Sequence, residues 1–296
     1  MRRRTFLSTT AAALAGIPLA AHAGATGTAA AKLAQIERST GGRLGVFAID
    51  TGSTKQVLYR QNERFPMCST FKFLLVADVL ARVDRGQEEL KRRIWYGKSD
   101  VLDYAPETTL HVRDGMTVRD LCEAAIELSD NTAANLLLKS VGGPHAVTAY
   151  ARSLGDRVTR LDRTEPSLNT AIPGDPRDTT TPAAMGADMA RILVGTGALS
   201  AVSRGALQSW LSECKTGTAL LRAGLPSSWQ VGDKTGLGGP HNTFGDSSTR
   251  NDIAIAWPPG ESPIIVTAYL TGAKVKAADR DAAIASVGRI LGEALR

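Results

Sequence analysis

The sequence is poor in several residue types that mark particular classes of protein. It has three cysteines, none of them in a Cys-x-x-Cys pair, and four scattered histidines without His-Glu-x-x-His spacing. A disulfide-built scaffold is excluded and a metal site is disfavoured, so we expect no metal or other cofactor. Aromatic residues make up only 5% of the 296 residues, and no dense block of Lys or Arg lies in the body of the chain. Despite a net charge of +6, these two features argue against a nucleic-acid-binding protein.

Long apolar runs are also absent, and none reaches the roughly 20 residues that a membrane-spanning helix needs. The N-terminus instead has three arginines at 2–4, a short apolar run over 11–21 and the small-x-small sequence Ala21-His22-Ala23. This order is typical of a secretion signal, and the paired arginines resemble the twin-arginine export type. We expect residues 1–23 to be a signal peptide cleaved after Ala23, since a membrane anchor would need a longer apolar run. The mature chain would be a periplasmic monomer, not bound to membrane, with a charge of about +3 because three arginines are removed.

What remains has ordinary globular composition, 43% hydrophobic and 22% charged. Helical spacing of apolar residues predicts a series of helices, at 29–38, 71–85, 118–128, 133–141, 145–154, 182–194, 203–211 and 277–295. Alternating or β-branched runs predict strands, at 43–50, 55–60, 230–234, 252–257 and 263–270. Between the fifth and sixth helices lies an irregular stretch over 156–181, and loops of that length are usually functional or disordered.

The order of these elements predicts a mixed fold of an α/β part and an all-α part. An early hairpin needs further strands to be stable, and the late strands can supply them. We expect an antiparallel sheet of about five strands, flanked by the terminal helices and formed by residues 24–65 and 213–296. A helical domain over 66–212 would be inserted between them, with the active site between the two parts.

The first candidate for chemistry is Ser69-Thr70-Phe71-Lys72, at the start of a predicted helix. Residues three apart lie on the same helical face, so Lys72 would be beside the Ser69 hydroxyl. A serine hydroxyl is a weak nucleophile until an adjacent base takes its proton, and Lys72 could be that base or could orient one. The alternative is a serine at a helix start with a solvent-exposed lysine.

Two more motifs follow, Ser129-Asp130-Asn131 between two predicted helices and Lys234-Thr235-Gly236 at the end of a predicted strand. Taken alone, the first could be a helix cap and the second a turn. All three motifs in this order, about 60 and 100 residues apart, resemble the set that characterises class A serine β-lactamases and penicillin-binding proteins. The resemblance to a class A serine β-lactamase covers nearly the whole mature chain.

A fourth match, Glu165-Pro166-Ser167-Leu168-Asn169, lies in a loop at about 160–180 that resembles the Ω-loop of that family. The resemblance implies that Glu165 activates the water that hydrolyses the acyl-enzyme and that Asn169 also holds this water. A carboxylate within reach of the water is what this chemistry needs. Arg163 and Asp178 match the ion pair that closes the neck of the loop.

The resemblance further implies that Ser69 attacks the β-lactam carbonyl, with either Lys72 or Glu165 as the acylation base. Backbone NH groups of Ser69 and Leu237 would bind the oxyanion, and Ser129 would pass a proton to the leaving nitrogen. The implied catalytic set is thus Ser69, Lys72, Ser129 and Glu165. The implied substrate-binding residues are Asn131, Asn169, Lys234, Thr235, Gly236, Leu237, Tyr104 and Arg250, with no metal ligand.

Several positions depart from the family pattern. The stretch 238–249 is longer than usual, and Leu237 lacks the hydroxyl or small side chain common there. Cys68 precedes the nucleophile as in broad-spectrum members, but the position of its partner holds Gly238. Cys122 matches half of another family disulfide, whose second position holds Val76. We therefore expect three free thiols, the third being Cys214.

Three functions remain open at this point. A β-lactamase acting on penicillins and cephalosporins would hydrolyse its acyl-enzyme quickly, as Glu165 and Asn169 imply. A peptidoglycan D,D-carboxypeptidase or transpeptidase would deacylate slowly. A non-enzymatic β-lactam sensor would stay acylated and would need a membrane-spanning signalling segment.

Overall fold

The computed structural model describes residues 22–239 and 247–296, with side chains from residue 28 onward. The predicted signal peptide lies almost wholly outside the described residues, and so does most of the long 238–249 connection. Within the described ranges, no helix has the length and apolar character needed to cross a membrane.

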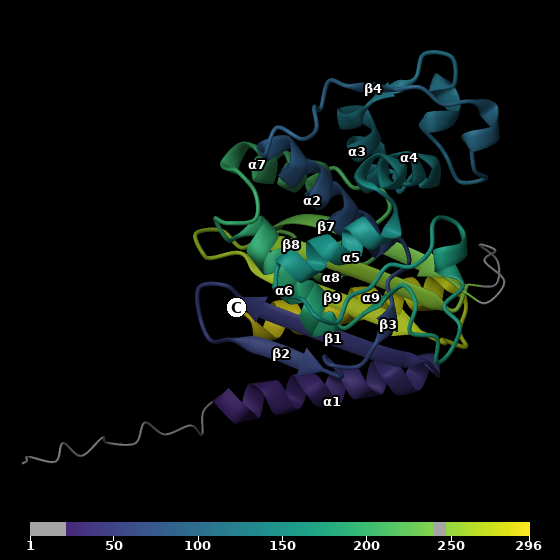
Figure 1. Cartoon of the computed structure of the whole chain (residues 1–296). Helices are drawn as coiled ribbons and strands as arrows, with labels where there is room; N and C mark the ends of the chain where they lie inside the picture. The colour runs from purple at the N-terminus through teal and green to yellow at the C-terminus, as the bar shows by residue number, and fades with distance from the viewer. Residues whose placement is uncertain (1–21, 240–246) are drawn as a thin grey trace, which may run out of the picture.

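A five-stranded antiparallel sheet lies at the centre of the molecule, in the order β2-β1-β9-β8-β7 (Figure 1). Its strands are β1 (Arg43–Asp50), β2 (Gln56–Tyr59), β7 (Gln230–Gly238), β8 (Thr249–Trp257) and β9 (Ile264–Thr271). Strand β1 pairs with β2 on one side and with β9 on the other, so the two ends of the chain form one sheet. The predicted fold class, an antiparallel sheet of about five strands with helices, is confirmed.

The terminal helices cover one face of this sheet. Helices α1 (His22–Thr40), α8 (Leu221–Gly224) and α9 (Ala277–Ala294) pack there, and α1 runs beside β1 and β2 in Figure 1. Side chains alternate along β8, because successive residues of a strand point to opposite faces. Ala254 and Ala256 belong to the core under the terminal helices, whereas Ile253 and Ile255 belong to the core on the other face.

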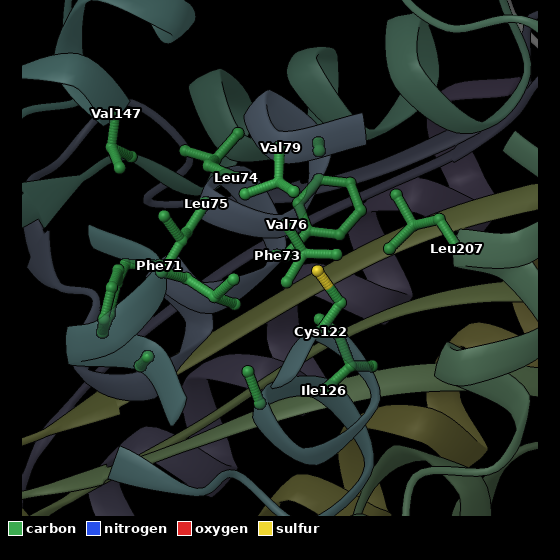
Figure 2. Close-up of a cluster of buried hydrophobic side chains, with 14 of the residues drawn as sticks. Phe71, Phe73, Leu74, Leu75, Val76, Val79, Cys122, Ile126, Val147 and Leu207 are labelled. Atoms are coloured by element: carbon green, nitrogen blue, oxygen red, sulfur yellow. The ribbon is translucent and has the colours of Figure 1, made fainter. Parts of the chain in front are cut away.

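The remaining helices lie on the side of the second face. They are α2 (Phe71–Asp84), α3 (Val118–Glu127), α4 (Asn131–Val141), α5 (Pro144–Ser153), α6 (Pro182–Leu193) and α7 (Ala201–Ser212). Of these, α6 and α7 contact the strands of the sheet, whereas α3, α4 and α5 pack against α2. Helix α2 is buried from Phe71 to Ala81, and Figure 2 shows its apolar side chains packed against neighbours that include Cys122 and Leu207. A helix that is apolar all round has to lie inside the protein. Since α2 begins at Phe71, two residues after Ser69, this packing fixes the position of the predicted nucleophile.

The structure differs from the sequence-based prediction at β7, which does not end at Lys234 but continues through Gly238. The Thr and Gly residues that suggest a turn are instead paired with β8, Thr235 opposite Asp252 and Leu237 opposite Arg250. The Lys234-Thr235-Gly236 motif therefore lies inside an edge strand.

Short elements that the sequence did not predict complete the fold. They are the paired strands β3 (Phe65–Pro66) and β6 (Thr179–Thr180), the paired strands β4 (Arg93–Ile94) and β5 (Met116–Thr117), and the 3-10 turns η1 (Cys68–Thr70), η2 (Lys98–Asp100), η3 (Thr108–His111) and η4 (Ser167–Asn169). Pieces of two to four residues are too short to show a hydrophobic period.

Candidate active site

Ser69 lies in the turn η1, immediately before the buried helix α2. Cys68 has a left-handed backbone, with φ of 46°, a conformation that non-glycine residues rarely adopt. Thr70 stabilises the turn by donating its hydroxyl hydrogen to the Met67 carbonyl at 2.8 Å. Ser69 and Lys72 are both buried, so the two residues predicted to work together lie one turn apart in the interior.

The Lys72 ammonium lies among oxygen acceptors. Its Nζ donates to the Ser129 carbonyl and to Asn131 Oδ1, both at 2.7 Å, and lies 3.1 Å from Glu165 Oε1. Burial lowers the pKa of Lys72, and the neighbouring Glu165 carboxylate opposes that shift. Because an ammonium has three hydrogens to donate, these three acceptors suit the charged form of Lys72.

Ser129 is held between two lysines. It follows α3 with a left-handed backbone, φ 58°, and its Oγ lies 2.9 Å from Lys234 Nζ and 3.3 Å from Lys72 Nζ. Asp130 caps α4 by accepting from the Ala133 NH at 2.8 Å. Burial, followed by smaller effects that include repulsion from Lys72, lowers the pKa of Lys234 to about 8. Since both lysines donate to Ser129 Oγ, its own hydrogen points elsewhere.

Glu165 lies across the site from α2. The Ser69 hydroxyl donates to Glu165 Oε1 at 3.2 Å, and Asn169 Nδ2 donates to Glu165 Oε2 at 2.5 Å. The backbone of Glu165 is fixed by Asn135 on α4, which accepts from its NH at 3.0 Å and donates to its carbonyl at 2.9 Å. Asn135 was not among the predicted residues. The one signal that could have found it is its place one turn after Asn131, on the same face of the helix.

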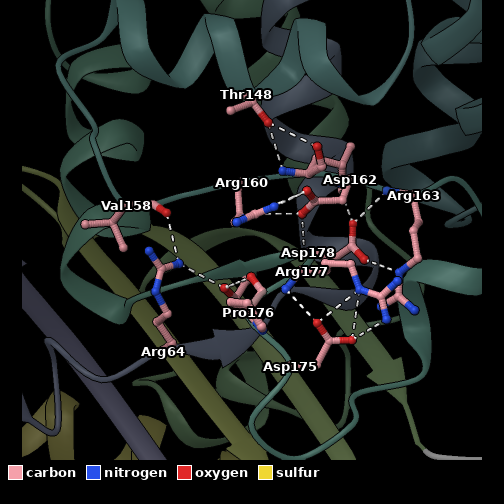
Figure 3. A network of polar contacts seen from close by, with 12 residues as sticks. Arg64, Thr148, Val158, Arg160, Asp162, Arg163, Asp175, Pro176, Arg177 and Asp178 are labelled. Atoms are coloured by element: carbon pink, nitrogen blue, oxygen red, sulfur yellow. Dashed lines mark hydrogen bonds and ion pairs between the residues drawn. The ribbon is translucent and has the colours of Figure 1, made fainter.

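The loop that carries Glu165 is closed at its ends by ion pairs (Figure 3). Arg163 Nε lies 2.5 Å from Asp178 Oδ2, as the resemblance predicted. Asp178 Oδ1 also accepts from the backbone NH groups of Asp162 and Arg163 at 2.7 and 2.9 Å. A buried carboxylate with several donors holds both ends of the segment together. The position of Glu165 therefore depends on contacts more than ten residues away in sequence.

Two glycines let strand β7 approach the nucleophile. A side chain at Gly236 would lie within 2.8 Å of the Met67 carbonyl, and one at Gly238 would lie within 2.6 Å of Cys68 Sγ. Only glycine avoids these overlaps. Gly238 is thus adjacent to Cys68. This agrees with the family resemblance, in which position 238 is that of the cysteine that some members pair with the one before the nucleophile. In this chain Cys68, Cys122 and Cys214 are buried and free.

Eight of the twelve predicted residues line one cleft with two adjoining compartments, whereas the buried residues Lys72, Glu165, Lys234 and Gly236 are not part of its lining. The inner one has a volume of about 250 Å³ and is lined by Ser69, Tyr104, Ser129, Asn131, Asn169, Thr216, Thr235, Leu237 and Arg250. The outer one, of about 390 Å³, shares four of these residues, Tyr104, Asn131, Asn169 and Leu237. A cleft with convergent polar side chains, next to buried lysines whose pKa is lowered, is typical of a small-molecule site. Larger hollows elsewhere lack this chemistry.

Arg250 reaches this cleft from β8. Its side chain is 14% exposed, and its Nε donates to Asp281 Oδ1 of α9 at 2.6 Å. An arginine held at Nε can still present its two terminal nitrogens to an anion. Thr216 lines the same compartment and was not predicted, because it belongs to no recognised motif.

Comparison with known proteins agrees with this geometry. The model of the "Beta-lactamase enzyme family" matches residues 28–295. The chain belongs to the beta-lactamase enzyme family. It is 47% identical to β-lactamase CTX-M-25 of Escherichia coli over 98% of this chain and 97% of that protein. It is 42% identical to β-lactamase OXY-1 of Klebsiella oxytoca over the full length of both.

Solved structures give the same result. The ancestral class A β-lactamase of Gram-negative bacteria superposes with a TM-score of 0.86 and 61% identity, over 90% of this chain and 99% of that one. The predicted family, fold class and enzyme class, a β-lactamase hydrolase, are confirmed. In the part of the chain that the structure describes, no three His, Cys, Asp or Glu side chains are grouped as a metal site requires.

Proposed function

We propose that this β-lactamase hydrolyses penicillins and cephalosporins through an acyl-enzyme on Ser69, with Glu165 as the base in both half-reactions. The observation that carries the proposal is the position of Glu165, whose two carboxylate oxygens lie within hydrogen-bond distance of Ser69 and Asn169. In acylation the Ser69 hydroxyl loses its proton to Glu165 as Oγ bonds to the lactam carbonyl carbon. Before deacylation Glu165 gives this proton up, by way of the Lys72 ammonium beside it, to Ser129, which has lost its own hydrogen to the lactam nitrogen. The Glu165 carboxylate then takes a proton from the attacking water and returns it to Ser69 Oγ as the ester bond breaks.

Lys72 is assigned to orienting and electrostatic stabilisation rather than to proton abstraction. Its ammonium faces Ser129, Asn131 and Glu165, an arrangement that matches three donors with three acceptors. The charge would favour the oxyanion as it develops, together with the backbone NH groups of Ser69 and Leu237.

Ser129 delivers the proton to the leaving lactam nitrogen. Its Oγ accepts from Lys72 and Lys234, so its hydrogen is available for donation. Lys234, whose Nζ lies 2.9 Å from Ser129 Oγ, keeps its proton and supports this transfer by its positive charge.

The rest of the cleft recognises the substrate. Thr235 and Arg250 would bind its carboxylate, with Lys234 behind them as a further positive charge. Asn131 would donate to the acylamide carbonyl, and Tyr104 and Leu237 would border the side chain in the outer compartment. Asn169 would hold the hydrolytic water together with Glu165. Gly236 allows β7 to lie close to the Met67 carbonyl.

We also propose export to the periplasm through a twin-arginine signal cleaved after Ala23, and action there as a monomer that confers antibiotic resistance. The arginines at 2–4 and the Ala21-His22-Ala23 sequence support the signal.

The test is turnover of nitrocefin by the purified protein, with and without EDTA. Ser69→Ala should abolish turnover. Glu165→Gln should slow both half-reactions, but acylation the less because Lys72 remains beside Ser69 as an alternative base, so an acyl-enzyme should accumulate that mass spectrometry detects. A wild type that accumulates acyl-enzyme would instead favour a transpeptidase or a sensor. Absence of turnover in the wild type would contradict the proposal.

A further inference from the structure

Thr216 lies in the connection between α7 and α8 and contacts a residue that the proposed function assigns to the substrate carboxylate. Its Oγ1 lies 2.6 Å from Thr235 Oγ1, and both residues line the inner compartment with Ser69. Thr235 is 4% exposed, so water has little access to its hydroxyl. The orientation of the Thr235 hydrogen is therefore set mainly by its protein partner.

The backbone around Thr216 is fixed. The NH of Lys215 donates to the Glu127 carbonyl at 2.9 Å, which ties the connection to the end of α3. At Gly217 a side chain would overlap the buried Asp233 carboxylate, so the chain lies directly against the sheet there. Thr216 is consequently held in place from both sides, and its hydroxyl is preorganised rather than free to move away.

Hydrogen counting fixes the direction of the contact when an anion is bound. A carboxylate only accepts, so Thr235 must donate its single hydrogen to the substrate. At 2.6 Å the neighbouring hydroxyl must then be the donor to Thr235, which commits the Thr216 hydrogen. Cys214 Sγ lies 3.4 Å from Thr216 Oγ1 and can donate a weak S–H bond to it. Successive hydroxyl bonds of this kind polarise one another.

We propose that Thr216 is a positioning residue for substrate binding: its hydroxyl donates to Thr235 and so points the Thr235 hydrogen at the substrate carboxylate. This inference rests on the proposed role of Thr235. It assigns to this chain a specificity for anionic β-lactams that depends on a pair of hydroxyls, in addition to the charges of Lys234 and Arg250.

The experiment compares Thr216→Val, which removes the hydroxyl with little change in volume, with Thr216→Ser, which keeps it. Each is assayed with nitrocefin, which has a free carboxylate, and with its neutral methyl ester. Loss of one hydrogen bond should raise the KM of Thr216→Val for the acid about three- to ten-fold. Its kcat, and its kcat/KM for the ester, should stay within about two-fold of wild type, as should all values for Thr216→Ser.

A double-mutant cycle with Thr235→Val completes the test. If Thr216 acts through Thr235, the double variant should bind the acid no more weakly than Thr235→Val alone. Additive losses, or equal losses for acid and ester, would overturn the inference. Neither result affects the proposed function, which fails only if the wild type does not turn over nitrocefin.

Discussion

Arg250 and Asp281 form an ion pair that links the cleft to the C-terminal helix, with Nε and Oδ1 2.6 Å apart. Residue 250 pairs with Leu237 across the β7–β8 ladder, so the arginine lies directly beside the rim of the site. Asp281 holds Nε and leaves the other guanidinium nitrogens for a ligand. The helix at the end of the chain therefore helps to orient a side chain that is proposed to bind substrate.

Loss of this arginine should weaken binding of carboxylate substrates. Arg250→Ala should raise KM about ten-fold or more, because a charge-assisted hydrogen bond is lost. Asp281→Asn keeps a hydrogen-bond acceptor and should raise KM only about two- to five-fold. Steady-state kinetics with a penicillin and a cephalosporin check both values. Equal KM values for wild type and Arg250→Ala would show that Arg250 does not bind the substrate carboxylate.

Activity should fall on the alkaline side as Lys234 loses its proton. Burial lowers its pKa to about 8 in the free enzyme, so the positive charge is present below that pH and lost above it. We expect kcat/KM for anionic substrates to decline through about pH 8. Lys234→Arg stays charged throughout this range and should lack the decline. If kcat/KM of Lys234→Arg declines over the same pH range as in the wild type, the titration of a group other than Lys234 causes the decline.

Deacylation should depend on Asn135, since this side chain makes two hydrogen bonds to the backbone of Glu165. Asn135→Ala should lower kcat about ten-fold or more by misplacing the carboxylate. Because hydrolysis of the ester slows more than its formation, KM should fall together with kcat, and mass spectrometry should find acyl-enzyme. A rise in KM without acyl-enzyme would show that acylation is the step affected.

The residues proposed to be catalytic could be recognised in the sequence because each belongs to a short motif whose chemistry is local. Ser69 and Lys72 share a helix face, and the other motifs lie at the ends of elements with clear hydrophobic periods. The strands of the central sheet could also be predicted, because each has a clear hydrophobic pattern of its own. The order of the strands and the packing of α2 bring the motifs to one cleft, and neither was predicted, because both depend on contacts between segments distant in sequence.

The supporting residues could not be predicted, since their partners are distant in sequence. Asn135 contacts a loop 30 residues away, and Asp281 contacts a strand 31 residues away. Thr216 lies in a connection that has no hydrophobic period. The full length of β7 was missed because its glycines suggest a turn, whereas here they allow close approach to Met67 and Cys68.

A buried carboxyl group should make stability depend on pH. Asp188 on α6 is fully buried, and burial followed by repulsion from Asp156 raises its pKa to about 8. Arg191, with Nη1 3.5 Å from Asp188 Oδ1, and Arg152 oppose this shift only in part. The Tyr150 hydroxyl lies near both the Asp188 and the Asp78 carboxyl groups. Asp188 is therefore protonated in the folded protein at neutral pH and ionised in the unfolded chain.

The sign of the effect follows from proton binding. Between about pH 4 and pH 8 the folded state holds a proton that the unfolded state has released, so rising pH favours unfolding. The Asp188 contribution should fall by up to about 1.4 kcal/mol per pH unit in this window. Asp188→Asn stays neutral and should gain stability over wild type as pH rises from 5 to 8, measured by urea unfolding. Asp175→Asn is the control, because Arg177 lowers the pKa of that partly buried carboxyl to about 2 and its effect should not change between pH 5 and 8. A constant difference between Asp188→Asn and wild type over this range would show that Asp188 does not titrate there.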